Sequence, residues 1–124
     1  MLKENFNSNQ VILIEEVNKG RLVKTSEILY LEADDNYCRI FLTGKEKILV
    51  TKSLKSYEDE LSPNIFFRCH KSYLVNISHI KEYVIGRNES KIILNDTTSI
   101  QVARRRACEL KRFLQIQLCR LPVS

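Results

Sequence analysis

The sequence predicts an antiparallel, mostly β domain, and two features of the chain indicate it. Short runs of apolar and β-branched residues, about 4–6 residues each, follow one another along the chain. The only three glycines, Gly20, Gly44 and Gly86, each fall between two such runs, where a tight turn needs a permissive backbone. A chain of 124 residues with 44% hydrophobic content suits a single core.

The strands are expected in a simple order. Residues 1–10 are polar and patternless, which predicts a tail or linker, and the domain is expected to occupy residues 11–121. Residues 11–14 and 21–24 flank Asn18-Lys19-Gly20 and predict a hairpin. The other strand-like runs are residues 28–31, 37–42, 47–50, 65–67, 73–75, 91–94 and 98–102.

Two segments show helical spacing instead. Ser53 can cap a helix in which Leu54, Tyr57 and Leu61 recur on one face, so a short helix is expected at about residues 53–61. A second helix, with one apolar and one basic face, is expected at about residues 104–118. The apolar face holds Ala107, Leu110, Leu114 and Leu118, and the basic face holds Arg105, Arg106, Lys111 and Arg112.

Charge is unevenly distributed along the chain. The net charge is +5, with a pI near 9.1. Residues 1–35 carry four Lys/Arg and seven Asp/Glu, whereas residues 36–124 carry sixteen and eight. This basic bulk predicts a polyanionic partner. No apolar run approaches the ~20 residues that cross a bilayer, and the N-terminus has no apolar signal core, so a cytoplasmic protein without membrane contact is expected.

Residues for catalysis or metal binding are not grouped in the sequence. The four cysteines form no C-x-x-C pair, and His70 and His79 have no neighbouring ligand set. The adjacent Cys69 and His70 would point to opposite faces of a strand. The sequence therefore predicts no enzyme, metal, cofactor or small-molecule substrate. Cys38 lies in a polar stretch and is a candidate for exposure. The cysteines expected to be buried are Cys69, Cys108 and Cys119.

Polar and basic residues gather at three strand ends. These clusters are Asn36-Tyr37-Cys38-Arg39, Arg68 with His70-Lys71-Ser72, and Arg104-Arg105-Arg106. Arginine and lysine can neutralise phosphates and hydrogen-bond guanine O6 and N7, and asparagine suits adenine. Any one cluster could be a solvated loop, but three of them, all at strand ends in one small domain, favour a shared binding surface.

The stretch from Phe66 to Asn76 resembles the signature of LytTR-type (LytR/AgrA family) DNA-binding domains of bacterial response regulators. Arg68-Cys69-His70-Lys71-Ser72 stands where that signature has Arg-x-His-(Arg/Lys/Asn)-Ser, and an aromatic residue and then Val75-Asn76 follow. Other matching segments, in the same order as in the family, are 28–33, 52–55, 77–80 and 100–104. The resemblance covers the chain from about residue 11 to residue 114.

This resemblance implies a mainly β, elongated fold of small antiparallel β-sheets with two short helices. It also implies that loops enter two successive major grooves of double-stranded DNA, as in the output half of a two-component regulator of transcription. Such domains pair on direct repeats in promoters when a receiver domain is phosphorylated. The resemblance therefore allows a homodimer that forms on DNA.

The resemblance also assigns roles to individual residues. The residues expected to contact base edges are Asn36, Tyr37, Cys38, Lys71 and Arg104, with Cys38 best aligned in its loop. The residues expected to contact phosphates are Arg39, Arg68, His70, Ser72 and Arg105. For His70 a second role is favoured, in which it hydrogen-bonds backbone to hold the loop. Asn76 is expected to organise a turn through its side-chain amide.

Three departures from the family pattern bear on the DNA target. Cys38 is a poor hydrogen-bonding group, so Tyr37 or Asn36 would read the base instead. Lys71 stands where relatives have Asn or Arg, and lysine should favour guanine acceptors. Ala103 stands where serine is frequent, which removes one phosphate or capping contact.

Other classes of function stay open on the sequence alone. A protein-interaction or dimerisation module could use the same β scaffold with an incidental basic patch. RNA binding usually relies on exposed aromatic platforms, whereas Phe66, Phe67 and Tyr73 lie in apolar strand runs that suit a core. An enzyme is the weakest alternative, because the sequence offers no convergent set of reactive residues.

Overall fold

The computed structural model describes residues 10–16 and 18–120, and side chains as far as Gln117 in the last helix. Its strands are β1 (Val11–Glu15), β2 (Gly20–Lys24), β3 (Ile28–Asp34), β4 (Tyr37–Leu42), β5 (Lys47–Val50), β6 (Phe66–His70), β7 (Tyr73–Asn76), β8 (Ile80–Ile85), β9 (Ser90–Leu94) and β10 (Ser99–Val102). Its α-helices are α1 (Leu54–Glu60) and α2 (Ala107–Arg120). Short 3-10 segments are η2 (Thr25–Glu27), η3 (Thr43–Lys45), η4 (Ile77–His79) and η5 (Arg104–Arg106).

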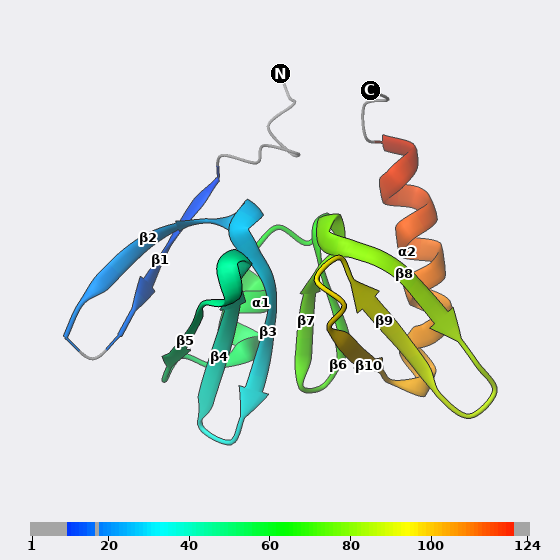
Figure 1. Ribbon diagram of the computed structural model, residues 1–124, viewed down its shortest axis with the longest axis horizontal. Coiled ribbons are helices and arrows are strands. Elements are labelled where there is room, and N and C mark those ends of the chain that lie inside the picture. Colours follow the sequence, from blue (N-terminus) through cyan, green and yellow to red (C-terminus); the bar gives the residue numbers. More distant parts are fainter. Residues whose placement is uncertain (1–9, 17, 121–124) are drawn as a thin grey trace.

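The strands form three antiparallel sheets (Figure 1). The central sheet has the order β5-β4-β3-β7-β6, the β1–β2 hairpin forms a second sheet, and the third has the order β10-β9-β8. In Figure 1 the hairpin stands at one end of the molecule, and α2 stands with β8 at the other. This is the mainly β, elongated fold with two helices that the family resemblance implied.

Alternate residues of the central sheet face two different hydrophobic cores. Phe66 of β6 and Leu74 of β7 belong to a core shared with the β1–β2 hairpin and α1. Their neighbours Phe67 and Val75 belong to a core shared with β9, β10 and α2. Successive side chains of a strand point to opposite faces, so the one sheet joins both halves of the molecule.

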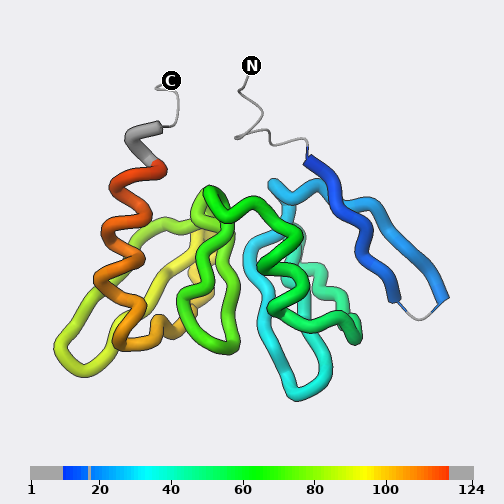
Figure 2. The backbone as a smooth tube through the Cα atoms, turned by 180° about the vertical axis from the view of Figure 1, so that it is seen from behind, coloured from blue at the N-terminus to red at the C-terminus, as the bar shows by residue number. Residues whose placement is uncertain are grey.

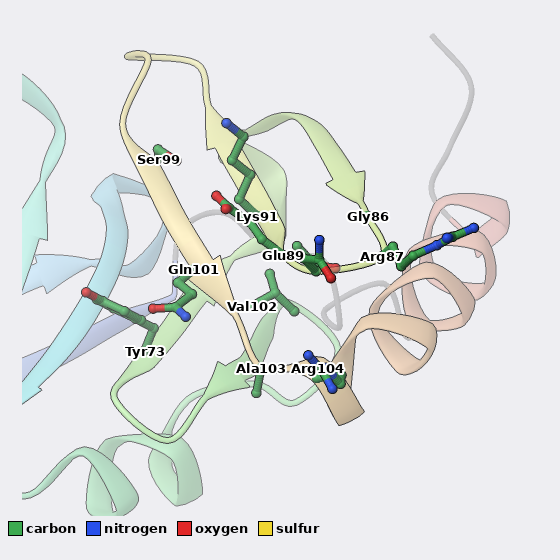
Figure 3. Close-up of a pocket in the computed structure, with 12 residues that line it drawn as sticks. Tyr73, Gly86, Arg87, Glu89, Lys91, Ser99, Gln101, Val102, Ala103 and Arg104 are labelled. Atoms are coloured by element: carbon green, nitrogen blue, oxygen red, sulfur yellow. The ribbon is translucent and has the colours of Figure 1, made fainter.

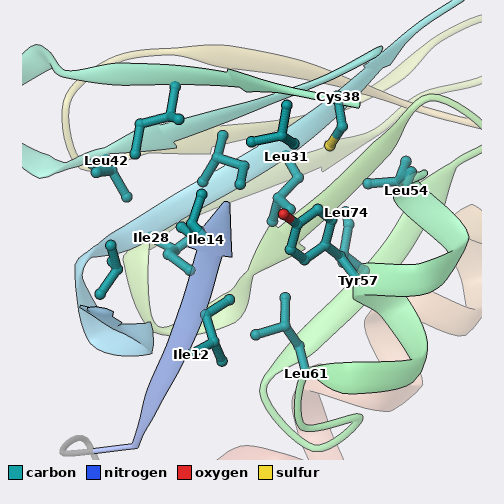
Figure 4. Packing of buried hydrophobic residues seen from close by; sticks show 14 of the residues in the cluster. Ile12, Ile14, Ile28, Leu31, Cys38, Leu42, Leu54, Tyr57, Leu61 and Leu74 are labelled. Carbon is teal, nitrogen blue, oxygen red and sulfur yellow. The ribbon is translucent and has the colours of Figure 1, made fainter. Parts of the chain in front are cut away.

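The first core holds the hairpin and α1 against the central sheet (Figure 4). Ile12 and Ile14 come from β1, Tyr57 comes from α1 and Leu61 follows it, and all four pack in one cluster with Leu31 of β3. None of these five side chains is more than 5% exposed. Burying one such side chain contributes about 1.5–3 kcal/mol, so packing, rather than helix propensity, holds the seven-residue α1.

Both expected helices are present, with small changes at their ends. Ser53 caps α1, because its Oγ accepts a hydrogen bond from the Ser56 N–H at 3.1 Å. The second helix starts as the 3-10 segment η5 and becomes α-helical only at Ala107. Its expected apolar face is buried at Ala107, Leu110 and Leu114. The side chain of Leu118 lies outside the described residues.

Two of the cysteine predictions are wrong. Cys108 is exposed rather than buried, because it stands one residue beyond Ala107 and so turns away from the apolar face of α2. Cys38 is buried rather than exposed. Cys69 is buried as expected, and the side chain of Cys119 lies outside the described residues.

The chain ends bear on two further expectations. Residues 1–9 of the expected tail, and the expected helix stop at Leu121-Pro122, lie outside the described residues. In the part of the chain that is described, no helix is long and apolar enough to cross a membrane.

Candidate nucleic-acid interface

Three segments that carry the predicted contacts meet at one edge of the molecule. The β3–β4 turn, the β6–β7 turn and η5 all lie along the lower edge in Figure 1, and Figure 2 shows the same arrangement from behind. Backbone hydrogen bonds tie them together. The Ala33 N–H donates to Ser72 O at 2.8 Å, and the Ala103 N–H donates to Cys69 O at 2.8 Å. We call this edge, with its three segments, the turn edge.

The β3–β4 turn presents the Asp35 carboxylate and two uncharged side chains beyond a neutralised arginine. Asn36 is exposed and Tyr37 is 48% exposed at the tip. Asp35 adopts a φ of 56°, a left-handed conformation that Asp tolerates better than most residues. Behind the tip, Arg39 pairs with Asp34 at 2.6 Å and with Glu32 at 3.5 Å. The charge of Arg39 is therefore already engaged by carboxylates of its own hairpin.

The β6–β7 turn is braced by Arg68, whose guanidinium contacts three partners. Its Nε donates to His70 O at 3.0 Å and its Nη2 donates to Lys71 O at 2.5 Å. Its Nη1 donates to the Glu58 carboxylate of α1 at 2.7 Å. Arg68 thus links the turn to the helix, while the Lys71 side chain is left exposed at the tip.

Two further polar residues shape the same region. The Ser72 N–H donates to His70 Nδ1 at 3.1 Å, which is the loop-holding contact expected of His70. The buried Asn76 accepts the Ser78 N–H at 2.9 Å through Oδ1 and donates to Ile28 O at 2.9 Å through Nδ2. This confirms that Asn76 organises the turn at η4, and it also fastens that turn to β3.

The arginine run at η5 divides between the surface and the interior. Arg106 turns inward: its Nε donates to Arg68 O at 2.9 Å, and its guanidinium lies 4.8 Å from the centre of the Phe67 ring. It also pairs with Glu109 one turn later. Arg104 and Arg105 are exposed. Of the basic face expected from the sequence, Arg105, Lys111 and Arg112 are exposed, whereas Arg106 turns inward.

A polar groove of about 650 Å³ opens beside Arg104 (Figure 3). It lies between the β8–β9 turn, the strands β9 and β10 and the start of η5. Its lining includes the cations Arg87, Lys91 and Arg104, and its one carboxylate is that of Glu89. Tyr73 stands at the end of the groove nearest the β6–β7 turn, and burial, more than the charge of Glu32, raises the pKa of its phenol.

The cations of this region fall into two groups. Those with a carboxylate partner are Arg39, Arg68 and Arg106. Those without a carboxylate within 4.0 Å, among residues 10–16 and 18–120, are Lys71, Arg87, Lys91, Arg104 and Arg105. The second group retains its full charge for an outside partner.

Comparison with known proteins assigns the chain to a family. Residues 18–115 match the family model described as the LytTr DNA-binding domain. The chain belongs to the LytTr DNA-binding domain family. A LytTr DNA-binding domain from Bacillus cereus has the same fold, with a TM-score of 0.73 at 24% identity, over 84% of this chain and 95% of that one.

Two curated relatives of this LytTr domain are longer proteins, which the chain matches over part of their length. The chain is 31% identical over 99 residues to the transcriptional regulatory protein LytR of Staphylococcus aureus (strain N315), which is 79% of the chain and 40% of LytR. It is 32% identical over 96 residues to the sensory transduction protein LytT of Bacillus subtilis (strain 168), which is 77% of the chain and 39% of LytT. The chain therefore spans about two fifths of the length of these relatives.

The structure corrects one predicted base contact of this LytTr domain. Cys38 has no exposed surface, and its side chain packs in the first core with Leu31 and Leu54 (Figure 4). Burial raises the pKa of its thiol to about 11. A polar neighbourhood suggested exposure, but in β4 Tyr37 faces outward and Cys38, one residue on, faces inward. Asn36 and Tyr37 are the uncharged side chains of this turn that are exposed.

Sequence reasoning missed the residues of the groove. Arg87, Asn88 and Lys91 lie at or next to the turn between β8 and β9 and line the groove together with Arg104. A signal was available, because Gly86 was already placed between two strand-like runs and a cation follows it directly. These three residues repeat the pattern of polar and basic side chains at strand ends.

Cys69 and His70, which are adjacent in the sequence, do not form a pair of nucleophile and base. Cys69 is fully buried, and burial raises the pKa of its thiol to about 12. Its neighbour His70 lies on the other face of β6, half-buried against Tyr73. The described residues include no group of three or more His, Cys, Asp or Glu side chains arranged to hold a metal ion.

Proposed function

We propose that this chain binds double-stranded DNA in a sequence-specific manner, as the output domain of a transcription regulator. The observation that carries the proposal is the turn edge, where three separate segments present exposed polar side chains and unpaired cations. Two loops and the start of a helix lie along one edge, and this arrangement suits insertion into successive major grooves. On one face of the duplex, successive major grooves are one helical turn apart, about 10 bp. Binding of this kind needs no chemistry or cofactor.

We assign the reading of bases to four residues. Lys71 and Arg104 match the N7 and O6 acceptors of guanine, and Asn36 matches adenine. Tyr37 is the fourth, and it takes the base contact of the β3–β4 turn that the buried Cys38 cannot make. These side chains stand at the tips of the three segments, free of ion pairs in the described part of the chain.

We assign contacts with phosphates to a second set. Arg105 is exposed beside Arg104, and Ser72 and His70 flank Lys71. Our proposal excludes Arg39 and Arg68 from the phosphate contacts, because their guanidinium groups are held by carboxylates and carbonyls of the protein. Phosphate contacts fix the register of the domain on DNA and make its affinity depend steeply on salt.

The regulatory setting is proposed from the relatives. LytR of Staphylococcus aureus is a transcriptional regulatory protein, and this chain spans 40% of its length. We propose that the domain acts within a two-component regulator and binds direct repeats in promoters, with two copies pairing on the DNA. Pairing on DNA would appear as a second, cooperative binding step on a duplex with two half-sites.

Selection of duplexes from a random pool tests the proposal. The selected duplex and a scrambled one would be titrated across a salt series with the wild type and with Arg104→Ala. We expect the variant to lose roughly 1–3 kcal/mol on the selected duplex and much less on the scrambled one. Equal loss on both would place Arg104 among the phosphate contacts. Equal affinity of the wild type for every duplex would refute sequence-specific binding and favour a protein-interaction module.

A further inference from the structure

The groove beside Arg104 adds a contact that the three segments of the turn edge do not include. We propose that the β8–β9 turn is a fourth DNA contact, in which Arg87 and Lys91 bind backbone phosphates next to the base that Arg104 reads. This inference rests on the proposed function, and it extends the interface past η5 to the end of the molecule.

The position of the turn supports this role. In Figure 1 the β8–β9 turn ends at the lower edge, outside η5, and Figure 2 shows it at the same level from behind. Arg104 belongs to the wall of the groove and is also a candidate base contact. A major groove is only about 12 Å wide, so a side chain that reaches a base there has backbone phosphates close on either side. One of these two DNA backbones would lie in the protein groove that Arg104 lines.

The charges of the groove favour phosphate. Neither Arg87 nor Lys91 has a carboxylate within 4.0 Å among residues 10–16 and 18–120. The lining of the groove also includes uncharged donors, on the side chains of Asn88, Ser99 and Gln101. Figure 3 shows Lys91 and Gln101 on neighbouring strands, and these two residues are register partners of β9 and β10.

The shape of the turn is fixed by Gly86. Its N–H donates to Glu89 O at 3.0 Å, and a Cβ at this position would lie only 2.7 Å from the same oxygen. Only glycine fits this close approach without a shift of the backbone. The backbone of Arg87 and Asn88 therefore lies at the tip of a defined turn, so binding a phosphate there requires little ordering of the backbone.

Phosphate contacts make a specific prediction for the double variant Arg87→Ala/Lys91→Ala. Its matched control is Lys24→Ala/Lys47→Ala, which also removes two positive charges. Lys47 pairs with Phe41, at the end of β4 remote from Tyr37, so the control lies away from the turn edge. All four positions are at the protein surface or half-buried, and thermal unfolding of both variants would verify that they fold.

The full chain would be titrated with the selected duplex and the scrambled duplex over a salt series. We expect the slope of log affinity against log salt to flatten by about 0.9 for each phosphate that the variant no longer neutralises. Affinity should fall in parallel on both duplexes, so that the ratio between them is unchanged. A hydroxyl-radical footprint of the variant should lose protection at one flank of the site and retain the rest.

The outcomes separate the two proposals. If the wild type prefers its selected duplex while the double variant matches the control in slope and footprint, the fourth contact is refuted and the proposed function stands. If the double variant loses preference for the selected duplex at an unchanged slope, these residues read bases and the phosphate role is refuted. If the wild type binds every duplex equally or none, both proposals fail.

Discussion

The β3–β4 turn and the β6–β7 turn stand together at the turn edge, yet they handle charge in opposite ways. In the β3–β4 turn, Arg39 is neutralised by Asp34 and Glu32, and the carboxylate of Asp35 is exposed. In the β6–β7 turn the inner arginine, Arg68, is the neutralised one, and Lys71 is exposed at the tip. The first turn thus offers DNA a net negative charge, and the second offers a net positive charge.

The two turns also differ in what holds them. The contacts of Arg39 stay within its own hairpin, whereas Arg68 joins its turn to Glu58 on α1. Arg106 adds a further link, because it donates to Arg68 O from η5. We infer that the second turn is the rigid, attractive part of the interface, and that the first contributes discrimination between bases more than affinity.

The largest effect is expected from Arg68→Ala. The change leaves the Glu58 carboxylate and the carbonyls of His70 and Lys71 without their donor. A hydrogen bond to a charged group is worth about 1.5–3 kcal/mol, so both stability and affinity for the selected duplex should fall. Urea unfolding and DNA titration measure the two losses.

Arg68→Lys is the informative companion of that variant. Lysine keeps the positive charge but cannot reproduce the three-way contact of a planar guanidinium. We therefore expect it to behave like Arg68→Ala. Affinity restored to the wild-type value by lysine would show instead that Arg68 acts as a simple charge facing phosphate, and the contrast between the two turns would break down.

A smaller effect, confined to DNA, is expected from Lys71→Asn. Lysine favours guanine acceptors and asparagine favours adenine, so the base preferred at one position of the selected site should change. Affinity for the wild-type site should drop by about 1–3 kcal/mol, with no change in unfolding by urea. Repeating the duplex selection with the variant measures this, and an unchanged profile would remove Lys71 from the base contacts.

A gain of affinity is expected from Asp35→Asn. This change removes an exposed negative charge from the tip of the first turn, and asparagine tolerates the φ of 56° at this position. Two unit charges 4 Å apart interact by about 1 kcal/mol in water, and salt screens part of that, so a gain of a few-fold is expected. Glu27→Gln, also exposed but beyond the far end of β3, is the control. A gain of the same size from both would reflect net charge alone.

Much of the fold could be predicted because its signals are local. The strands Tyr37–Leu42 and Lys47–Val50 have the bounds that their apolar runs predicted, and Ser53 caps α1 as its position suggested. Alternation along a strand and spacing along a helix depend only on neighbouring residues. Cys38 was misplaced because its polar neighbours were given more weight than that alternation.

The tertiary contacts of the site could not be predicted in the same way. The pair of Arg68 and Glu58 joins β6 to a helix ten residues earlier, and the inward turn of Arg106 depends on the position of Phe67. The sequence shows that these residues are charged, but not which charges neutralise each other. That partition decides which cations stay available to DNA, and it moved Arg39 and Arg68 out of the proposed contacts.

The smallest effect on DNA binding is expected from Cys38→Ala, whose main consequence should be on stability. Burial raises the pKa of the Cys38 thiol to about 11, above the value of about 8.5 for a thiol in an unfolded chain. The folded protein then holds this proton more tightly, so the stabilisation is complete below pH 8.5 and is lost as the pH rises towards 11. In reducing buffer, the free energy of unfolding should therefore fall less steeply above pH 8.5 in Cys38→Ala than in the wild type. Cys69 accounts for part of the remaining slope, because the pKa of its thiol is raised to about 12.

The duplex selected by Cys38→Ala should be that of the wild type, because a buried side chain cannot touch a base. A changed base preference would return Cys38 to the interface and make the two turns alike.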